Sequence, residues 1–231
     1  MDGIINVYKE RGFTSHDVVA KLRGILKQKK IGHTGTLDPE AQGVLPVCLG
    51  KGTKVCELLT DKTKTYQAVL LLGTVTDTQD ITGTVLKTGE VTCTEAHVRT
   101  CIADCIGTQE HVPPMYSALK VNGRKLYELA RQGVEVERKA RTITIEEIQI
   151  DQVELPEVTI TVTCSKGTYI RTLCHDIGQA LGCGGCMKSL LRTRVVIFEL
   201  EDSITLAEIE QKRDAGTLDQ SIYAVDSVFG A

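Results

Sequence analysis

Apolar residues recur along the first quarter of the chain at spacings that predict a strand, a helix and a second helix. Residues 3–8 (GIINVY) are rich in β-prone side chains and predict a short strand. Apolar positions at helical spacing over 18–26 predict a helix that begins at Thr14 or Ser15, either of which can cap it. Thr53 is expected to start a further short helix.

Between these two helices lies the segment 32–43 (GHTGTLDPEAQG). Its glycines and Pro39 allow neither a regular helix nor a central strand. Apolar runs flank it on both sides, so we expect a loop that buried structure holds at both ends. Such loops are frequent positions for binding and catalytic residues.

The rest of the chain mixes strands and helices without the regular alternation of a parallel, doubly wound sheet. This favours an α+β fold with a large, mixed and mostly antiparallel sheet flanked by helices. No linker rich in Pro, Gly or Ser divides the chain, so we expect one domain over residues 1–231. Residues 65–75 are predicted to form a strand buried on both faces, 80–86 the return arm of a hairpin, and 115–121 a strand before an Asn-Gly turn. Further strands are predicted at 142–146, 158–164 and 195–200. Helices are predicted at 94–105, 124–133 and 168–181.

Composition excludes several classes of protein. The chain has 231 residues, of which 42% are hydrophobic, enough for a substantial core. No stretch of about 20 apolar residues predicts a membrane helix, and the N-terminus lacks the pattern of a signal peptide. The nine cysteines are odd in number and lie at apolar positions, which is typical of reduced thiols and predicts a cytoplasmic location.

Charge is distributed unevenly although the net charge is only -3. Basic residues outnumber acidic ones in residues 9–30 and again in 120–141, whereas carboxylates dominate after residue 198. Two basic segments can form a surface that binds a polyanion such as nucleic acid. Charge alone favours the alternative that these are ordinary solvated helix faces.

Asp38 is the candidate for chemistry in the 32–43 loop, because Pro39 fixes the backbone just beyond it. The structural alternative is an Asx turn, in which the carboxylate only binds nearby backbone N–H groups.

Arg171 falls in the first turn of a predicted helix, where the helix dipole disfavours a cation. A pair between Arg171 and Asp38 would offset that cost and favour an ionised carboxylate, and the alternative is an arginine that reaches solvent.

Three planar side chains could stack on a nucleic-acid base: His33, Tyr66 and Tyr169. A tyrosine at a strand end, like Tyr66, is more often a packing residue. The remaining histidines lack metal-ligand spacing, and the Cys183-Gly-Gly-Cys186 segment has no second ligand pair, so we expect no metal. A phosphate-binding loop at 50–53 is excluded because the required upstream glycine is replaced by Leu45.

Taken together, the motifs resemble the tRNA pseudouridine synthase B family, and the resemblance extends over essentially the whole chain. Five motifs occur in the family's order, which makes the match specific. They are KERGFTSHDVV from residue 9, GHTGTLDPEAQGVLP from residue 32, KTY from residue 64, MYSALKVNGRKLY from residue 115 and CSKGTYIRTL from residue 164, followed by Leu191-Arg192.

Two features depart from the family pattern. The first motif has Lys9-Glu10 where the family usually has Lys-Pro. Family members usually continue into a small C-terminal RNA-binding domain of the PUA type, and the sequence ends at about the point where that domain would begin. We therefore expect that domain to be absent and the affinity for tRNA to be lower than in longer relatives.

The resemblance implies a pseudouridine synthase fold and isomerisation of the uridine at position 55, in the T-loop of tRNA, without cofactor or metal. It implies catalytic roles for Asp38, Tyr66 and Arg171, a basic arm at about 120–141 that holds the T-stem-loop, and a monomer that needs no protein partner. The substrate-binding residues it implies are His33, Tyr169, Leu191, Lys9, Lys120, Arg124 and Lys125.

Two alternatives stay open at this point. One is a tRNA-binding or tRNA-folding protein in which catalysis is secondary, since both functions need the same grip on the RNA. The other is a guide-RNA-dependent relative that works in a multi-protein particle.

Overall fold

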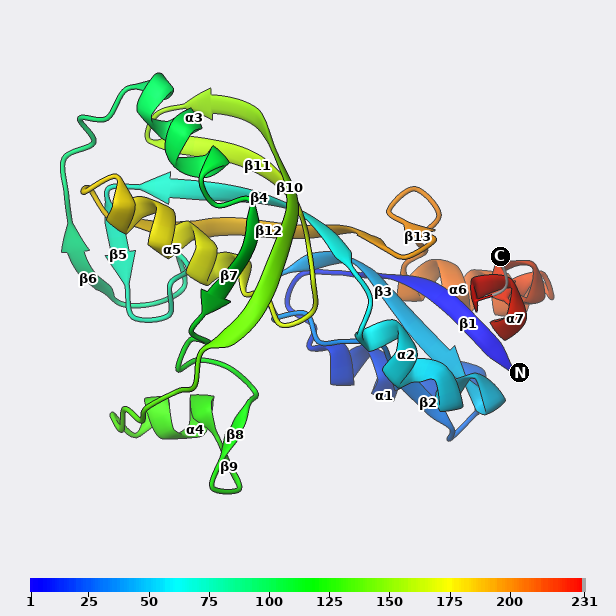
Figure 1. Cartoon of the computed structure of the whole chain (residues 1–231). Helices are drawn as coiled ribbons and strands as arrows, with labels where there is room; N and C mark the ends of the chain where they lie inside the picture. Colours follow the sequence, from blue (N-terminus) through cyan, green and yellow to red (C-terminus); the bar gives the residue numbers. More distant parts are fainter. Residues whose placement is uncertain (230–231) are drawn as a thin grey trace. The chain divides into compact units, whose positions relative to one another are not determined.

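A computed structural model describes residues 1–229 and divides the chain into two compact units, each described here by itself (Figure 1). Unit 1 contains residues 1–67 and those from 190 onward, and unit 2 contains 68–189. The chain passes from one unit to the other along β4 (Lys64–Leu72) and returns along β12 (Gly185–Val195). The expected single domain over 1–231 stays a prediction, and its last two residues lie outside the described part.

Unit 1 is built on a sheet in which β1 is central and antiparallel to both of its neighbours, β3 and β14. The short strand β2 also pairs with β3, and β12 runs parallel to β3 with Leu191 opposite Gln42. Because β12 is the parallel member of an otherwise antiparallel set, the sheet is mixed. The strand bounds are β1 Gly3–Lys9, β2 Ile31–His33, β3 Gln42–Leu49, β13 Phe198–Glu199 and β14 Ile222–Tyr223.

Helix α1 (Ser15–Leu26) begins at Thr14, which forms a capping box with Asp17, so of the two predicted caps Thr14 is the one used. Its buried residues Val18, Val19 and Leu22 join a core with strands β1 and β3 and with α6. The remaining helical elements of unit 1 are the 3-10 helices Gly50–Val55 and Leu218–Ser221 and the helices α2 Cys56–Thr60, α6 Leu206–Asp214 and α7 Val225–Phe229.

Unit 2 contains the strand order β4-β11-β10-β7, in which β10 and β11 form a long antiparallel hairpin. Helix α3 packs against β10 and α5, and the small hairpin β8–β9 with α4 extends beyond the end of β7, forming the arm (Figure 1). The bounds are β5 Thr74–Thr76, β6 Val85–Thr88, α3 Glu95–Ala103, β7 Gly107–His111, β8 Lys120–Val121, β9 Arg124–Lys125, α4 Leu126–Arg131, β10 Arg141–Glu154, β11 Glu157–Cys164 and α5 Ile170–Ala180.

The predicted α+β class with a mixed, mostly antiparallel sheet is confirmed. Several local predictions were wrong, including the strands at 80–86 and 195–200, of which the structure keeps only β6 from Val85 and the short β13 beyond the end of β12. Strand β4 alternates buried with partly exposed residues and is not buried on both faces. Only residues 120–121 of the expected strand 115–121 are extended in a sheet, because residues 113–119 follow an irregular path. Strand β12 was missed, since its polar residues interrupt the apolar pattern on which the prediction relied.

Candidate active site

The loop that carries Asp38 spans residues 34–41 and is fixed at both ends. The backbone N–H and the hydroxyl of Thr34 both donate to the carbonyl of Pro46, each at 3.1 Å. At the middle of the loop, Leu37 N–H donates to Ser15 Oγ at 2.9 Å. The Asp38 carbonyl accepts from Ala41 N–H at 3.0 Å, which closes a turn over Pro39 and leaves the aspartate half-buried.

Lys9 stabilises this loop through hydrogen bonds to backbone carbonyls. Its side chain is fully buried, and Nζ donates to the carbonyls of Glu10 (3.1 Å), Phe13 (2.5 Å) and Pro39 (3.2 Å). Burial lowers the pKa of Lys9 to about 8, and the nearby charge of Asp38 counteracts part of that shift. This placement favours a role in holding the loop rather than the substrate contact expected from the sequence.

Arg192 on β12 holds the loop from its other side, a role that the sequence analysis missed. It is 1% exposed, and Nε donates to the carbonyl of Val44 at 2.7 Å while Nη2 donates to Gly35 at 3.5 Å. A Cβ on Gly43 would lie 2.2 Å from the Arg192 carbonyl oxygen, so glycine is required there. The available signal was the neighbour Leu191, whose motif includes this arginine.

The other predicted residues of unit 1 lie on its strands. His33 ends β2, its ring meets His16 edge to face at 5.1 Å, and burial lowers its pKa. Tyr66 on β4 is 9% exposed. Leu191 on β12 is half-buried.

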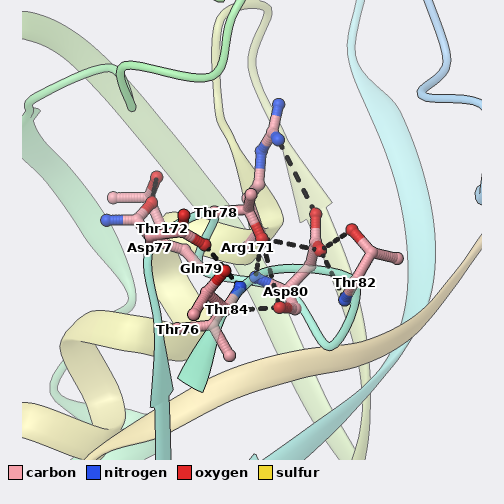
Figure 2. A network of polar contacts seen from close by, with 9 residues as sticks. All are labelled: Thr76, Asp77, Thr78, Gln79, Asp80, Thr82, Thr84, Arg171 and Thr172. Carbon is pink, nitrogen blue, oxygen red and sulfur yellow. Dashed lines mark hydrogen bonds and ion pairs between the residues drawn. The ribbon is translucent and has the colours of Figure 1, made fainter. Parts of the chain in front are cut away.

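In unit 2, Arg171 lies in the first turn of α5 and is 6% exposed. Its Nη1 lies 3.8 Å from Oδ2 of Asp80, and the ion pair is drawn in Figure 2. Asp80 therefore supplies a negative partner at the helix end where a cation is disfavoured. The expected pair between Arg171 and Asp38 stays a prediction, because the two residues belong to different units.

The loop between β5 and β6 fixes the Asp80 carboxylate (Figure 2). Oδ1 accepts from the Thr78 hydroxyl and from Thr82 N–H, both at 2.9 Å, and from the Thr82 hydroxyl. Thr172, next to Arg171, donates to Gln79 Oε1 at 2.6 Å and so ties the loop to α5. The sequence analysis placed this segment in a plain hairpin arm, and its closely spaced Asp, Thr and Gly residues were the signal of a tight loop.

Tyr169 precedes α5 and contacts Arg171 and His111. Its backbone N–H donates to His111 Nε2 at 3.1 Å, the two rings stack at 6.2 Å, and the Arg171 guanidinium lies 5.6 Å from the tyrosine ring centre. His111 is buried, which lowers its pKa and favours the neutral imidazole that can accept this bond. Tyr169 thus helps to orient Arg171.

The arm presents the predicted basic residues on its β8–β9 hairpin. The turn is made by Asn122 and Gly123, both with positive φ, and it places Lys120 directly opposite Lys125. Like charges at such a position repel each other, and a bound anion would relieve the repulsion. Arg124 is exposed and donates to Gln132 Oε1 at 2.7 Å.

Two further properties concern the described residues as a whole. Within residues 1–229, no group of three or more His, Cys, Asp or Glu side chains is arranged to hold a metal ion. None of the helices in that range is both long and apolar enough to span a membrane.

Two family models match the chain in succession. The model described as "TruB family pseudouridylate synthase (N terminal domain)" matches residues 23–170, and that of the "tRNA pseudouridylate synthase B C-terminal domain" matches 171–229. The chain is 61% identical over 237 residues to tRNA pseudouridine synthase B of Lachnoclostridium phytofermentans, covering 99% of this chain and 77% of the relative. It is 48% identical over 234 residues to tRNA pseudouridine synthase B of Bacillus cereus, covering 98% of this chain and 76% of the relative.

Solved structures are similar at lower identity. A Cbf5-Nop10-Gar1 complex contains a chain that is 32% identical with a TM-score of 0.79, and the match covers 98% of this chain and 61% of that one. An H/ACA RNP bound to a substrate RNA containing 2'-deoxyuridine contains one that is 30% identical with a TM-score of 0.73, covering 98% and 60%. This chain thus spans about three fifths of the length of those structures' chains.

Proposed function

Because the chain belongs to the TruB family of pseudouridylate synthases, we propose that it isomerises the uridine at position 55, in the T-loop of tRNA, to pseudouridine. The relatives named as tRNA pseudouridine synthase B support tRNA as the substrate. The observation that carries the proposal is the Asp38 loop: a half-exposed carboxylate on a segment fixed by Thr34, Leu37 and the buried Lys9.

The reaction breaks the C–N glycosidic bond, turns the uracil and joins it to the ribose through carbon. It needs a positioned ionised carboxylate, a group that accepts the proton from C5, and a pocket that retains the free uracil. We assign the carboxylate to Asp38, the stacking and proton-transfer group to Tyr66, and parts of the pocket to His33 and Leu191. The reaction involves no redox step and no net hydrolysis, so we propose that it proceeds without a cofactor or metal.

Arg171 is the third proposed catalytic residue, as the partner of Asp38. Its pair with Asp80 and its contact with Tyr169 restrict the guanidinium to one region at the start of α5. Less free energy is needed to orient this guanidinium during the reaction than to orient a mobile one. This supports a role in turnover rather than in general RNA affinity.

We propose that the arm binds the T-stem-loop. Lys120 and Lys125, which lie opposite each other in the hairpin, and the exposed Arg124 beside them suit contact with phosphates. The enzyme must also extrude the target nucleotide, which costs a few kcal/mol of lost stacking. Phosphate contacts elsewhere on the RNA would offset that cost.

The test is release of tritium from uracil C5 of an unmodified T-stem-loop RNA by the purified protein alone. Asp38→Asn is expected to abolish release while RNA binding stays near the wild-type level. Glu40→Gln is the matched control, because Glu40 lies on the same loop, is exposed and pairs only with Arg11 among its described contacts. Release by Asp38→Asn at the wild-type rate would overturn the catalytic assignment.

The same experiment separates the alternatives. A tRNA-folding protein would bind the RNA without releasing tritium, and a guide-RNA-dependent enzyme would need further components. The 61% identity to a tRNA pseudouridine synthase B, against 30–32% to chains of a Cbf5-Nop10-Gar1 complex and of an H/ACA RNP, favours the enzyme that acts on tRNA directly. We propose that it acts as a cytoplasmic monomer, and its nine free cysteines suit a reducing compartment.

A further inference from the structure

Two of the nine free cysteines meet in unit 1, next to the strand that leads into the Asp38 loop. Cys48 lies on β3 and Cys56 is the first residue of α2. The Cys56 side chain packs on the apolar cluster to which Cys48 belongs, and each thiol shifts the pKa of the other. Neither residue has a role in the proposed reaction.

Gly32 shows how the two sulfur atoms are placed. It pairs with Cys48 across β2 and β3, so the side-chain position of Gly32 and the Cys48 side chain lie on the same face. A Cβ built on Gly32 would lie 3.4 Å from Cys56 Sγ. Cys56 Sγ therefore rests over the Gly32–Cys48 pair, in the space that the missing side chain leaves open.

The two thiols differ in their surroundings. Cys48 is fully buried, whereas Cys56 is partly exposed. Interaction with the Cys48 side chain lowers the pKa of Cys56, whereas interaction with Cys56, followed by burial, raises the pKa of Cys48. An accessible thiol that ionises more readily, beside a buried one, is the arrangement of an attacking and a resolving cysteine.

We propose that Cys56 is a site of reversible oxidation by peroxides and that Cys48 resolves it as an intramolecular disulfide. The Cys56 thiolate attacks one peroxide oxygen, the O–O bond breaks, and hydroxide leaves, which gives a sulfenic acid. The Cys48 thiol then attacks the Cys56 sulfur, an S–S bond forms, and the hydroxyl leaves as water with the thiol proton. In total two thiols and one hydrogen peroxide give a disulfide and two waters.

The disulfide would affect the Asp38 loop through Gly32. Closing it brings the two sulfur atoms to about 2.05 Å and draws α2 toward β3, against Gly32 of β2, the residue before His33. Displacing residues next to a catalytic group by even 1 Å can lower turnover by up to about 100-fold. This consequence for activity, unlike the disulfide itself, rests on the proposed function.

The experiment treats the full chain with hydrogen peroxide, alkylates the remaining thiols and maps tryptic peptides by mass spectrometry. Lys51 and Lys54 lie between the two cysteines, so trypsin separates them and a disulfide appears as a cross-linked peptide pair. We expect this pair in the wild type, its loss after a reductant, and its absence in Cys56→Ser and in the smaller-volume variant Cys56→Ala. In Cys48→Ser we expect a sulfenic acid on Cys56 that dimedone traps.

Cys105→Ser is the control, because Cys105 lies in unit 2 and its thiol donates to the carbonyl of Cys101. It should form the Cys48–Cys56 cross-link like the wild type. Tritium release by the oxidised wild type should fall about tenfold and recover on reduction. A reduced Cys56 after treatment, or a cross-link of other cysteines only, would overturn the oxidation site; a cross-link without loss of release would overturn only its effect on activity.

Discussion

The Arg171 guanidinium and the Asp80 carboxylate form a buried ion pair in which the two side chains are 7% and 17% exposed. The sequence analysis sought a partner for Arg171 because a cation at the start of a helix is disfavoured, and it considered Asp38 alone. Asp80 meets that need from the loop between β5 and β6. Since that loop fixes Asp80 through Thr78 and Thr82, the position of the guanidinium depends on a segment distant in sequence.

Replacing Asp80 with Asn tests whether this pair matters for turnover. The substitution keeps the size of the side chain but removes its charge, so Arg171 loses a buried partner and its preferred position. We expect kcat for tritium release to fall about 100-fold while RNA binding changes less than about threefold. Single-turnover release and a binding titration measure the two effects separately.

Asp104→Asn is the matched control for that variant, because Asp104 is an exposed carboxylate at the end of α3. It should leave both turnover and binding unchanged. An Asp80→Asn protein that binds RNA proportionally more weakly would assign the pair to RNA contact instead.

Lys9→Met tests how the Asp38 loop is held. Methionine has a similar length but cannot donate, so the carbonyls of Glu10, Phe13 and Pro39 lose the hydrogen bonds that they accept from Nζ. We expect the free energy of unfolding to fall by about 3 kcal/mol, measured by urea denaturation at neutral pH. Lys29→Met, at an exposed position, should change it by less than about 0.5 kcal/mol, and equal stability of the two variants would show that Lys9 does not brace the loop.

Local patterns in the sequence predicted those structural features that depend only on residues adjacent in the sequence. The cap at Thr14, the helix start at Thr94 and the Asn122-Gly123 turn each depend on a few adjacent residues, and all three are found. The irregular loop around Asp38 was predicted for the same reason, because its glycines and proline act on their own backbone.

The parts that could not be predicted depend on contacts between distant segments. Arg192 is buried because the backbone carbonyls of residues 35 and 44 converge on it, and the pattern of apolar residues around position 192 does not indicate this. Lys9 resembles any exposed basic residue until the carbonyl of Pro39, thirty positions away, is placed beside it. A cation can be buried where the fold supplies oxygen acceptors for it. The spacing of apolar residues along the sequence does not show where those acceptors will lie.

The arm gives a prediction about salt dependence. Arg124→Gln combined with Lys125→Gln removes two charges from the β8–β9 hairpin and leaves its turn intact. If both residues contact phosphates, the slope of log K against log salt should become shallower by about 1 to 2, because fewer counterions are released on binding. Filter binding of the T-stem-loop at several salt concentrations measures the slope.

The matched control is the pair Lys87→Gln and Arg99→Gln, on exposed positions of unit 2 outside the arm. It removes the same charge and should leave the slope close to the wild-type value. A slope unchanged by the arm substitutions would place Arg124 and Lys125 off the RNA interface.

His111 gives a prediction for acid pH. Burial holds its pKa in the folded protein below the ordinary value of 6.5, and its Nε2 must be unprotonated to accept from Tyr169 N–H. In the unfolded chain the imidazole takes up a proton below about pH 6.5, while in the folded state it stays neutral until its lower pKa is reached. The unfolded state therefore binds more protons in this window, and the stability that His111 contributes is full above pH 6.5 and declines as the pH falls.

His111→Gln isolates this contribution, because glutamine keeps an acceptor oxygen and does not titrate. Urea unfolding of both proteins between pH 7.5 and 5 is expected to show a steeper loss of stability in the wild type than in the variant. Because Tyr169 also contacts Arg171, protonation of His111 in the folded state should loosen the start of α5, so tritium release by the wild type should decline only once the pH falls to the lower, folded-state pKa of His111. Parallel stability curves for the two proteins would show that His111 is not held neutral by the fold, and the link from this histidine to Arg171 would then fail.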